Sequence, residues 1–328
     1  MIPRRVFSPA AVGIVLVGVG LAPSVMSTSQ VYSGTEVVIL SLFAVSYNLL
    51  FGYLGLLSFG HSAYFGLGAY ATALLLLHAP GVPLGPAIAG GTLAGAIGGV
   101  LIGNFCVRLS GPYFAMLTLA FGQLLFAVAW KWRAVTRGDD GFGGFLKHAS
   151  LALPGTPESG SQHSLYYLVV ALAVPVIAAT WALMTKTPFG NVVVSIRQNE
   201  ERAVFLGYDV FATKLITYTI SAGLAGLAGS LSAIFHDFVS PSVIDLNLST
   251  DVVLMTFIGG TTFFFGPVLG AVFFVYFGDF ISALTDRWQV VMGLIFVFMV
   301  LYVPKGFIGL GRLIPSVRPR ETRPETAP

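Results

Sequence analysis

A succession of long apolar segments limits the fold of this chain more than any other feature of its sequence. Segments of roughly 17 to 25 apolar residues are long enough to cross the hydrocarbon core of a bilayer as single helices. Only 9% of the 328 residues are charged, and the mean hydropathy is +0.85, whereas soluble domains carry about 25% charged residues. The sequence therefore predicts an all-α, polytopic integral membrane protein.

About ten transmembrane helices account for these segments. The first, near 10–25, resembles a signal peptide, but no convincing cleavage site follows it. We therefore interpret it as a retained helix, with removal as the minority alternative. The segment 250–285 is too long for one ordinary helix and contains Gly266 and Pro267, so we divide it into two short spans. A single kinked or re-entrant helix there would give nine spans. The other predicted spans lie near 35–51, 54–78, 85–106, 112–131, 165–185, 214–235 and 288–304.

The distribution of basic residues favours ten spans over nine. Lysines and arginines accumulate in the cytoplasmic loops of membrane proteins. With ten spans and the N-terminus inside, about 12 of the 17 basic residues lie in the cytoplasm, whereas nine spans would reverse this bias. Both termini are therefore predicted to be cytoplasmic. Residues 1–311 would form a single transmembrane domain, and the Pro- and charge-rich tail 312–328 is predicted to be disordered.

One polar stretch, residues 186–214, interrupts the apolar pattern, and we call it the polar island. Ser195 is predicted to cap a helix of about three turns, with Gln198 as its reciprocal partner and Gly207 as its left-handed stop. A narrow apolar stripe on this helix would be formed by Ile196, Ala203 and Val204. Its solvent-exposed face would carry Arg197, Glu200, Glu201 and Arg202. Such a helix suits a protein partner better than lipid, and the charge rule places it in the cytoplasm.

Small residues recur at helical spacing in two of the predicted spans. Gly91, Gly95, Gly99 and Gly103 are spaced by four, and Gly223, Gly226 and Gly229 are spaced by three. Such spacing lets neighbouring helices approach closely in a membrane. We expect these glycines to serve tight packing, with a lining role in a substrate path as the less favoured alternative.

Residues that carry chemistry in enzymes are sparse. No lysine lies in a Gly-x-x-x-x-Gly-Lys loop, so we expect no ATPase site in this chain. The five histidines show no metal-ligand spacing, and we predict no catalytic residues, metal or cofactor. The net charge of +3 is too small to indicate nucleic-acid binding. His61 is interpreted as a packed, hydrogen-bonded residue inside a span, with a substrate-path role as the alternative.

Six motifs occur along the chain: GYLGLLSFGHSAYFGLGAY at 52–70, GPYFAMLTLAFGQ at 111–123, TPFGNVVVSIRQNEERAVFLGYDV at 187–210, SAGLAGLAGSL at 221–231, FVSP at 238–241 and GG…FGPVLGA at 259–271. Together they resemble the permease subunits of branched-chain amino-acid ABC importers, the LivM type. The resemblance extends from about residue 35 to 311.

This resemblance implies a multi-pass permease of the type II (BtuC-like) kind in a bacterial inner membrane. It would work with a second, LivH-like permease, two cytoplasmic ABC ATPase subunits and a periplasmic substrate-binding protein. Alternating access driven by the ATPases would import branched-chain amino acids (leucine, isoleucine and valine) or related small amino acids or amides. Similar permeases also carry urea and small aromatic carboxylates, so the exact substrate stays open.

The resemblance also implies roles for individual residues. Glu201, Ala203 and Gly207 resemble the Glu-Ala-Ala…Gly pattern of the loop that enters the ATPase subunit, although Arg202 replaces the middle alanine. The expected ATPase-coupling residues are Ser195, Arg197, Glu200, Glu201, Ala203 and Gly207. The candidate translocation path comprises Asn48, Ser58, His61 and Tyr113. The candidate binding-protein docking residues, in a predicted outer loop at 132–163, are Arg133, Arg137, Asp139 and Asp140.

Two other classes of function compete with the importer. An ATP-independent secondary transporter or channel for a small polar solute would need paired broken helices with ion ligands near the midplane. The sequence shows an evident break only within 250–285. A membrane enzyme is the weaker rival, because no clustered catalytic constellation is visible.

Overall fold

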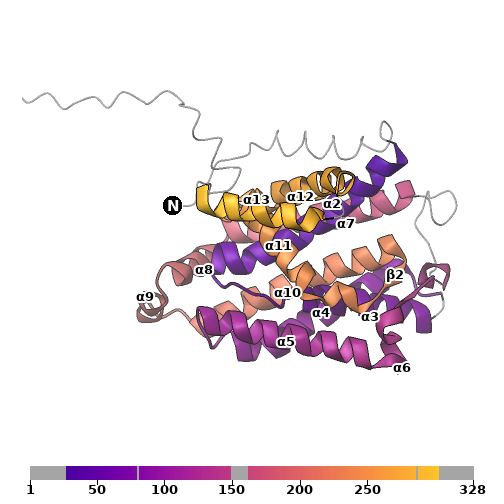
Figure 1. Cartoon of the computed structure of the whole chain (residues 1–328). Helices are drawn as coiled ribbons and strands as arrows, with labels where there is room; N and C mark the ends of the chain where they lie inside the picture. Colours follow the sequence, from indigo (N-terminus) through magenta and orange to yellow (C-terminus); the bar gives the residue numbers. More distant parts are fainter. Residues whose placement is uncertain (1–26, 80, 149–161, 286, 303–328) are drawn as a thin grey trace, which may run out of the picture.

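The computed structural model describes residues 27–79, 81–148, 162–285 and 287–302, and these residues form one bundle of helices (Figure 1). The predicted first span near 10–25 and the tail 312–328 lie outside the described residues. Because these segments are not described, the count of ten spans and the cytoplasmic position of both termini stay predictions. Nearly all of the larger helices run along the long direction of the bundle.

Within the described residues, five helices are long and apolar enough to cross a membrane. The first combines α2, Thr28–Asn48, with the π-helix η1, Leu49–Leu54. The others are α4, Leu84–Cys106; α5, Pro112–Lys131; α7, Gln162–Lys186; and α10, Val210–His236. Four shorter apolar helices are α3, Ser62–His78; α11, Leu246–Gly259; α12, Gly266–Ser282; and α13, Trp288–Tyr302.

Short elements lie at the two ends of the bundle. Helices α8, Pro188–Gln198, and α9, Glu200–Phe205, form what we call the α8–α9 end (Figure 1). The opposite end, the α6–β2 end, contains α6, Arg133–Thr136; η2, Gly138–Asp140; β1, Phe142–Gly143; η3, Phe145–His148; and β2, Phe238–Val239. Strands β1 and β2 pair antiparallel, with Phe142 opposite Val239. After β2, η4, Pro241–Ile244, leads into α11.

Close packing of α4 against α10 confirms the prediction made from the glycine spacing. A Cβ atom added at Gly95 would lie 2.8 Å from the Ala222 carbonyl oxygen and 2.8 Å from the Gly226 Cα. The opposite side of α4 carries exposed large apolar side chains at a spacing of four, Leu93, Ile97, Leu101 and Phe105, with Val100 beside them. Helix α4 therefore presents glycines to the protein and large apolar side chains to its surroundings, as expected of a helix in lipid.

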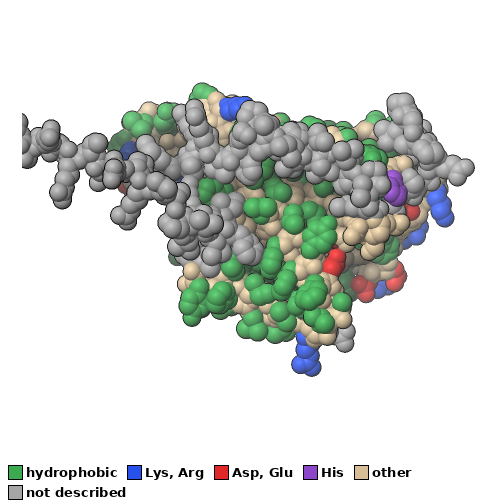
Figure 2. All heavy atoms as spheres, turned by 90° about the horizontal axis from the view of Figure 1, so that it is seen from above, with side chains coloured by type: hydrophobic (Ala, Val, Ile, Leu, Met, Phe, Trp, Pro, Cys, Tyr) green, Lys and Arg blue, Asp and Glu red, His purple; other side chains and the backbone are tan. Residues whose placement is uncertain are grey.

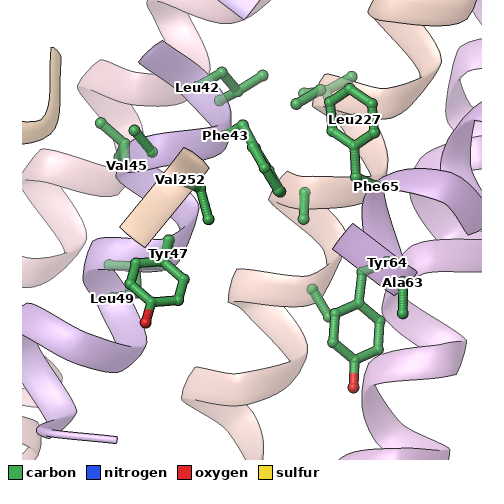
Figure 3. Packing of buried hydrophobic residues seen from close by; sticks show 14 of the residues in the cluster. Leu42, Phe43, Val45, Tyr47, Leu49, Ala63, Tyr64, Phe65, Leu227 and Val252 are labelled. Atoms are coloured by element: carbon green, nitrogen blue, oxygen red, sulfur yellow. The ribbon is translucent and has the colours of Figure 1, made fainter. Parts of the chain in front are cut away.

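The centre of the bundle is built from α2, α3, α10 and α11. Figure 3 shows Phe43 and Tyr47 of α2 facing Phe65 of α3 and Val252 of α11, all of them buried. On the face shown in Figure 2, many hydrophobic side chains are exposed, with few charged ones among them. A surface of this kind is stable in a bilayer and costly in water.

Two segments of the bundle repeat the same plan of a long helix, a stretch without α-helix and a shorter helix. In the first, α2 and η1 are followed by 55–61 and α3; in the second, α10 is followed by 237–245 and α11. The two long helices run antiparallel, because the ring of Tyr32 near the start of α2 lies 4.7 Å from the ring of Phe235 near the end of α10, while the Ser221 hydroxyl donates to the Ser46 carbonyl. The two shorter helices begin side by side inside the bundle, where Ser249 Oγ lies 2.7 Å from Ser62 Oγ.

The predicted span over 54–78 is wrong at its start. The first helix continues to Leu54, and α3 begins only at Ser62. Gly55 has φ +79°, a left-handed conformation that ends the preceding helix at little steric cost. By contrast, the predicted break within 250–285 is confirmed, because α11 and α12 are separate helices, while their count as two spans stays a prediction. Gly260 has φ +102° after α11, and Pro267 occupies the first turn of α12.

Candidate functional site

The polar island folds into two helices, so the predicted single helix capped by Ser195 is wrong. Ser195 lies inside α8, and its hydroxyl donates to the Asn191 carbonyl at 2.8 Å. Asn199 separates the helices with an extended backbone and caps α9, because its side chain accepts from the Arg202 N–H at 2.8 Å. Pro188 favours the start of α8, and two glutamates in the first turn of α9 favour its capped start.

The far end of α9 has the geometry that the sequence predicts. Gly207 adopts φ +85°, and its N–H donates to the Val204 carbonyl while the Tyr208 N–H donates to the Ala203 carbonyl. This pair of bonds is a Schellman ending, which requires a left-handed residue. Ile196 and Ala203 are buried as predicted, but Val204 is 57% exposed and does not belong to the buried stripe.

Exposed apolar side chains form a tip on α9 that the sequence prediction missed. Phe205 is 89% exposed and Leu206 is 68% exposed, and Val204 and Tyr208 lie beside them in the chain. We call Val204, Phe205, Leu206 and Tyr208 the apolar tip. The sequence feature that could have predicted the apolar tip is the apolar run Val204–Leu206, which closely follows charged residues in the polar island. The prediction had assigned the docking surface to the charges instead.

Glu200 binds within the chain, because its carboxylate lies 2.7 Å from the Lys214 ammonium. Lys214 is buried at the first turns of α10, whereas Glu200 is about half exposed. The pair therefore ties α9 to the start of the long helix α10. A lysine buried to this extent needs such a partner.

Arg197 is exposed overall, but its guanidinium contacts the bundle. Its guanidinium donates to the carbonyl of Gly52 in η1, and its Cγ lies 3.0 Å from the position that a Cβ atom at Gly55 would take. Gly52 in turn packs against the Asn48 side chain and the Thr261 carbonyl, the latter in the break between α11 and α12. The Arg197 side chain of α8 thus contacts the place where the end of η1, before the stretch 55–61, meets the break between α11 and α12.

The predicted path residues are only partly brought together. Ser58 and His61 share the non-helical stretch 55–61 and are fully buried. Asn48 is also buried but faces Gly52 near the α11–α12 break. Tyr113, in contrast, is 71% exposed at the start of α5 and lies apart from the buried three.

His61 has the packed environment that was predicted, although it precedes α3 instead of lying within a helix. Its Nε2 lies 2.9 Å from the Ser46 hydroxyl. The ring lies 5.4 Å from both the Phe43 and Tyr47 rings, and 6.0 Å from the Tyr64 ring. These three aromatic residues are among those drawn in Figure 3. His61 is therefore fixed at one nitrogen and surrounded by aromatic rings.

Several fully buried polar atoms around η1 and 55–61 have no hydrogen-bond partner among the residues that the structure describes. They include the Tyr47 hydroxyl, both amide atoms of Asn48, the Ser58 hydroxyl and His61 Nδ1. Buried polar groups are almost always paired, and an unpaired one costs about 1–3 kcal/mol. Their concentration at one broken segment marks a place suited to a polar solute or water.

The candidate docking residues lie at the α6–β2 end, opposite α8 and α9 (Figure 1). All four are exposed on α6, η2 and the residue between them: Arg133, Arg137, Asp139 and Asp140. The predicted loop at 132–163 is wrong for 133–148, which folds into short elements. Pairing of β1 with β2 and a 3.0 Å bond from the Leu146 N–H to the Asp237 carboxylate hold these elements in place.

Comparisons with known proteins agree with this architecture. The family profile described as branched-chain amino acid transport system / permease component matches residues 31–300. The high-affinity branched-chain amino acid transport system permease proteins LivM of Salmonella typhimurium and Escherichia coli are 27% and 26% identical over 316 residues, which cover 91% of this chain and 73% of each relative. The D-allose transport system permease protein AlsC of Escherichia coli is 27% identical over 199 residues, or 58% of this chain and 56% of its own length.

No solved structure matches the chain. The family profile nevertheless covers most of the sequence, including both broken segments, the polar island and the α6–β2 end. Together with its apolar helices, this match identifies a multi-pass membrane protein. The chain belongs to the family of branched-chain amino acid transport system permease components.

Proposed function

We propose that this chain is a transmembrane permease subunit of an ATP-driven importer for branched-chain amino acids or related small amino acids or amides. It would work in a bacterial inner membrane with a second, LivH-like permease, two cytoplasmic ATPase subunits and a periplasmic binding protein. The likeness to the LivM proteins over 91% of the chain supports the substrate class. The observation that carries the coupling role is the α8–α9 pair, which anchors Arg197 and Glu200 inward and presents an apolar tip outward.

The ATPase subunit would bind the apolar tip together with the exposed charges of Glu201 and Arg202. Protein interfaces commonly place large apolar side chains at their centre and polar groups at the rim. Phe205 has the exposure and size of such an anchor. The Gly207 ending keeps the tip rigid, so a movement of the ATPase would move α9 and α8 as a unit.

The solute path would pass the broken segment 55–61. The Ser58 hydroxyl, His61 Nδ1 and the Asn48 amide offer hydrogen-bonding atoms that lack partners within the described bundle. Aromatic rings border His61, so the surroundings combine polar contacts with apolar walls. A small amino acid with an apolar side chain fits that combination. Alternating access would expose these groups to each side of the membrane in turn.

The binding protein would dock at the α6–β2 end. Arg133, Arg137, Asp139 and Asp140 offer both signs of charge on short elements held by β1 and β2. Charges of this sort chiefly set the association rate and orientation of a partner. The opposite positions of the two docking surfaces agree with partners on opposite sides of a membrane.

One observation favours a second candidate, an ATP-independent transporter. The structure contains paired broken segments, 55–61 and 237–245, which meet inside the bundle as in several secondary transporters. The contacts at their meeting point are serine hydroxyls and the Ile244 carbonyl. A coupling-ion site of that class would need carboxylate ligands there, but the two carboxylates of 237–245 bind within the fold: Asp245 accepts from the Leu246 N–H and the Asn247 amide, and Asp237 accepts from the Leu146 N–H. We therefore retain the importer as the main proposal.

ATP hydrolysis by the purified assembly tests the proposal. We expect the chain to purify with a second permease and the ATPases, and the binding protein loaded with leucine to stimulate hydrolysis. Replacing the phosphate-loop lysine of the ATPase partner should abolish the activity. A thermal-shift panel of the binding protein against amino acids, urea and amides would assign the substrate. Hydrolysis by this chain alone, or an assembly insensitive to the loaded binding protein, would contradict the proposal.

A further inference from the structure

The last turn of the first spanning helix is capped by a residue from α8. Near a helix C-terminus, carbonyl groups lack a following helical N–H and attract cations. Gly52 lies in this turn, and its carbonyl accepts from the Arg197 guanidinium. Two residues contribute to this contact from different parts of the sequence, so it ties the polar island directly to the first span.

The contact depends on shape as well as charge. Gly55 has φ +79°, and the Cγ of Arg197 lies 3.0 Å from the position of a Cβ atom added there. A side chain at residue 55 would therefore strain the backbone and displace the arginine. The arginine stem covers the glycine while the planar guanidinium reaches beyond it to Gly52, a geometry that a lysine does not reproduce.

From this geometry we propose that Arg197 is a positioning residue that transmits movement of α8 to the broken segment 55–61. The inference deepens the proposed function and rests on it. Ser58 lies three residues after Gly55, and His61 directly precedes α3. A displacement of the η1 end therefore reaches the unpaired Ser58 hydroxyl and His61 Nδ1 through a short stretch without helical hydrogen bonds. The Arg197–Gly52 contact is the link between ATPase movement and the solute path.

The Thr261 carbonyl connects η1 with the break between α11 and α12. It lies 2.7 Å from the position that a Cβ atom added at Gly52 would take. Tyr53 of η1 also packs against Phe264 of the same break, with ring centroids 6.4 Å apart. Movement of η1 would therefore act on the α11–α12 break at the same time, so both broken regions respond to one residue of α8.

The test compares uptake with ATP hydrolysis in the reconstituted assembly. The variants are Arg197→Ala and Arg197→Lys, and the matched control is Gln198→Ala, an exposed neighbour on the same helix. Because coupling between sites typically changes an equilibrium 5- to 150-fold, we expect Arg197→Ala to lower solute transported per ATP by about fivefold or more. Arg197→Lys should be intermediate, and Gln198→Ala should match the wild type. Basal ATP hydrolysis, measured without the binding protein, should stay within about twofold in all three, a threshold well below that coupling range, whereas stimulation by the loaded binding protein crosses the same contact and should fall in Arg197→Ala.

The outcomes separate this link from simple structural support and from the proposed function. An unchanged ratio of solute to ATP in Arg197→Ala would overturn the link. Loss of assembly in both arginine variants, or a fall of basal ATP hydrolysis as large as the fall of uptake, would show that Arg197 only supports the structure and would also overturn the link. If the wild-type assembly shows no hydrolysis stimulated by the binding protein, the proposed function itself fails, and the link fails with it.

Discussion

At the scale of the residue, single glycines determine how closely α4 approaches α10. Gly95 is buried against Ala222 and Gly226, whereas Gly85, in the first turn of the same helix, has no atom within 4 Å of an added Cβ. We predict that Gly95→Ala lowers the free energy of unfolding by about 1–3 kcal/mol through overpacking. Gly85→Ala should change it by less than about 0.5 kcal/mol. Thermal unfolding in detergent measures both, and equal behaviour of the pair would contradict the packing argument.

A substitution at Gly207 tests whether the end of α9 needs a left-handed backbone conformation, independently of side-chain packing. No atom lies within 4 Å of an added Cβ there, so only its φ of +85° opposes a side chain. We predict that Gly207→Val loosens the end of α9, since the left-handed conformation costs about 1–2 kcal/mol for ordinary residues and more for a β-branched one. Uptake should fall several-fold with membrane insertion intact. Gly207→Asn, which tolerates this conformation, is the control, and normal uptake in the valine variant would place the coupling elsewhere.

At the scale of the element, the ion pair between α9 and α10 gives a further prediction. Glu200→Gln leaves the buried Lys214 ammonium without its carboxylate partner. Because Glu200 is half exposed, we expect a loss near the lower end of about 1–3 kcal/mol in the stability of the isolated chain. Glu201→Gln, the same change one residue later on the exposed side, should be nearly neutral. A stability loss of equal size in the two variants would show that the pair does not hold the helices together.

Most spanning helices could be predicted because apolar length alone specifies them in a membrane. The expected spans near 85–106, 112–131 and 214–235 correspond to α4, α5 and α10 within a few residues. The break at 55–61 was not predicted, since its residues are as apolar as a helix and hydropathy does not report backbone conformation. Gly55 and Gly60 were the available signal. The chain tolerates this non-helical stretch because it is buried in protein.

The candidate site was predicted less completely than the fold. Gly207 was identified correctly because a left-handed helix ending has a local sequence signal. The inward contacts of Arg197 and Glu200 join residues 145 and 14 positions apart, and no local pattern encodes such pairs. Asn199 and Pro188 did carry local signals for two helices. The prediction followed Ser195 instead, whose hydroxyl binds within its own helix.

At the scale of the whole molecule, the two ends of the bundle should respond differently to mutation. We predict that Asp139→Lys combined with Asp140→Lys slows binding-protein association several-fold at low salt, because these exposed carboxylates orient the partner. Basal ATP hydrolysis of the assembly should stay near normal. The double asparagine variant is the control and should show a smaller effect. Association at the wild-type rate at low salt would contradict the docking assignment.

Transport by the purified assembly in sealed proteoliposomes tests the central claim most directly. Leucine accumulation would be measured with ATP and the binding protein supplied to opposite faces, and separately with a proton or sodium gradient and no ATP. The account predicts accumulation only when ATP, the ATPase subunits and the loaded binding protein are all present. Accumulation driven by an ion gradient without ATP would contradict it and would identify this chain as a secondary transporter.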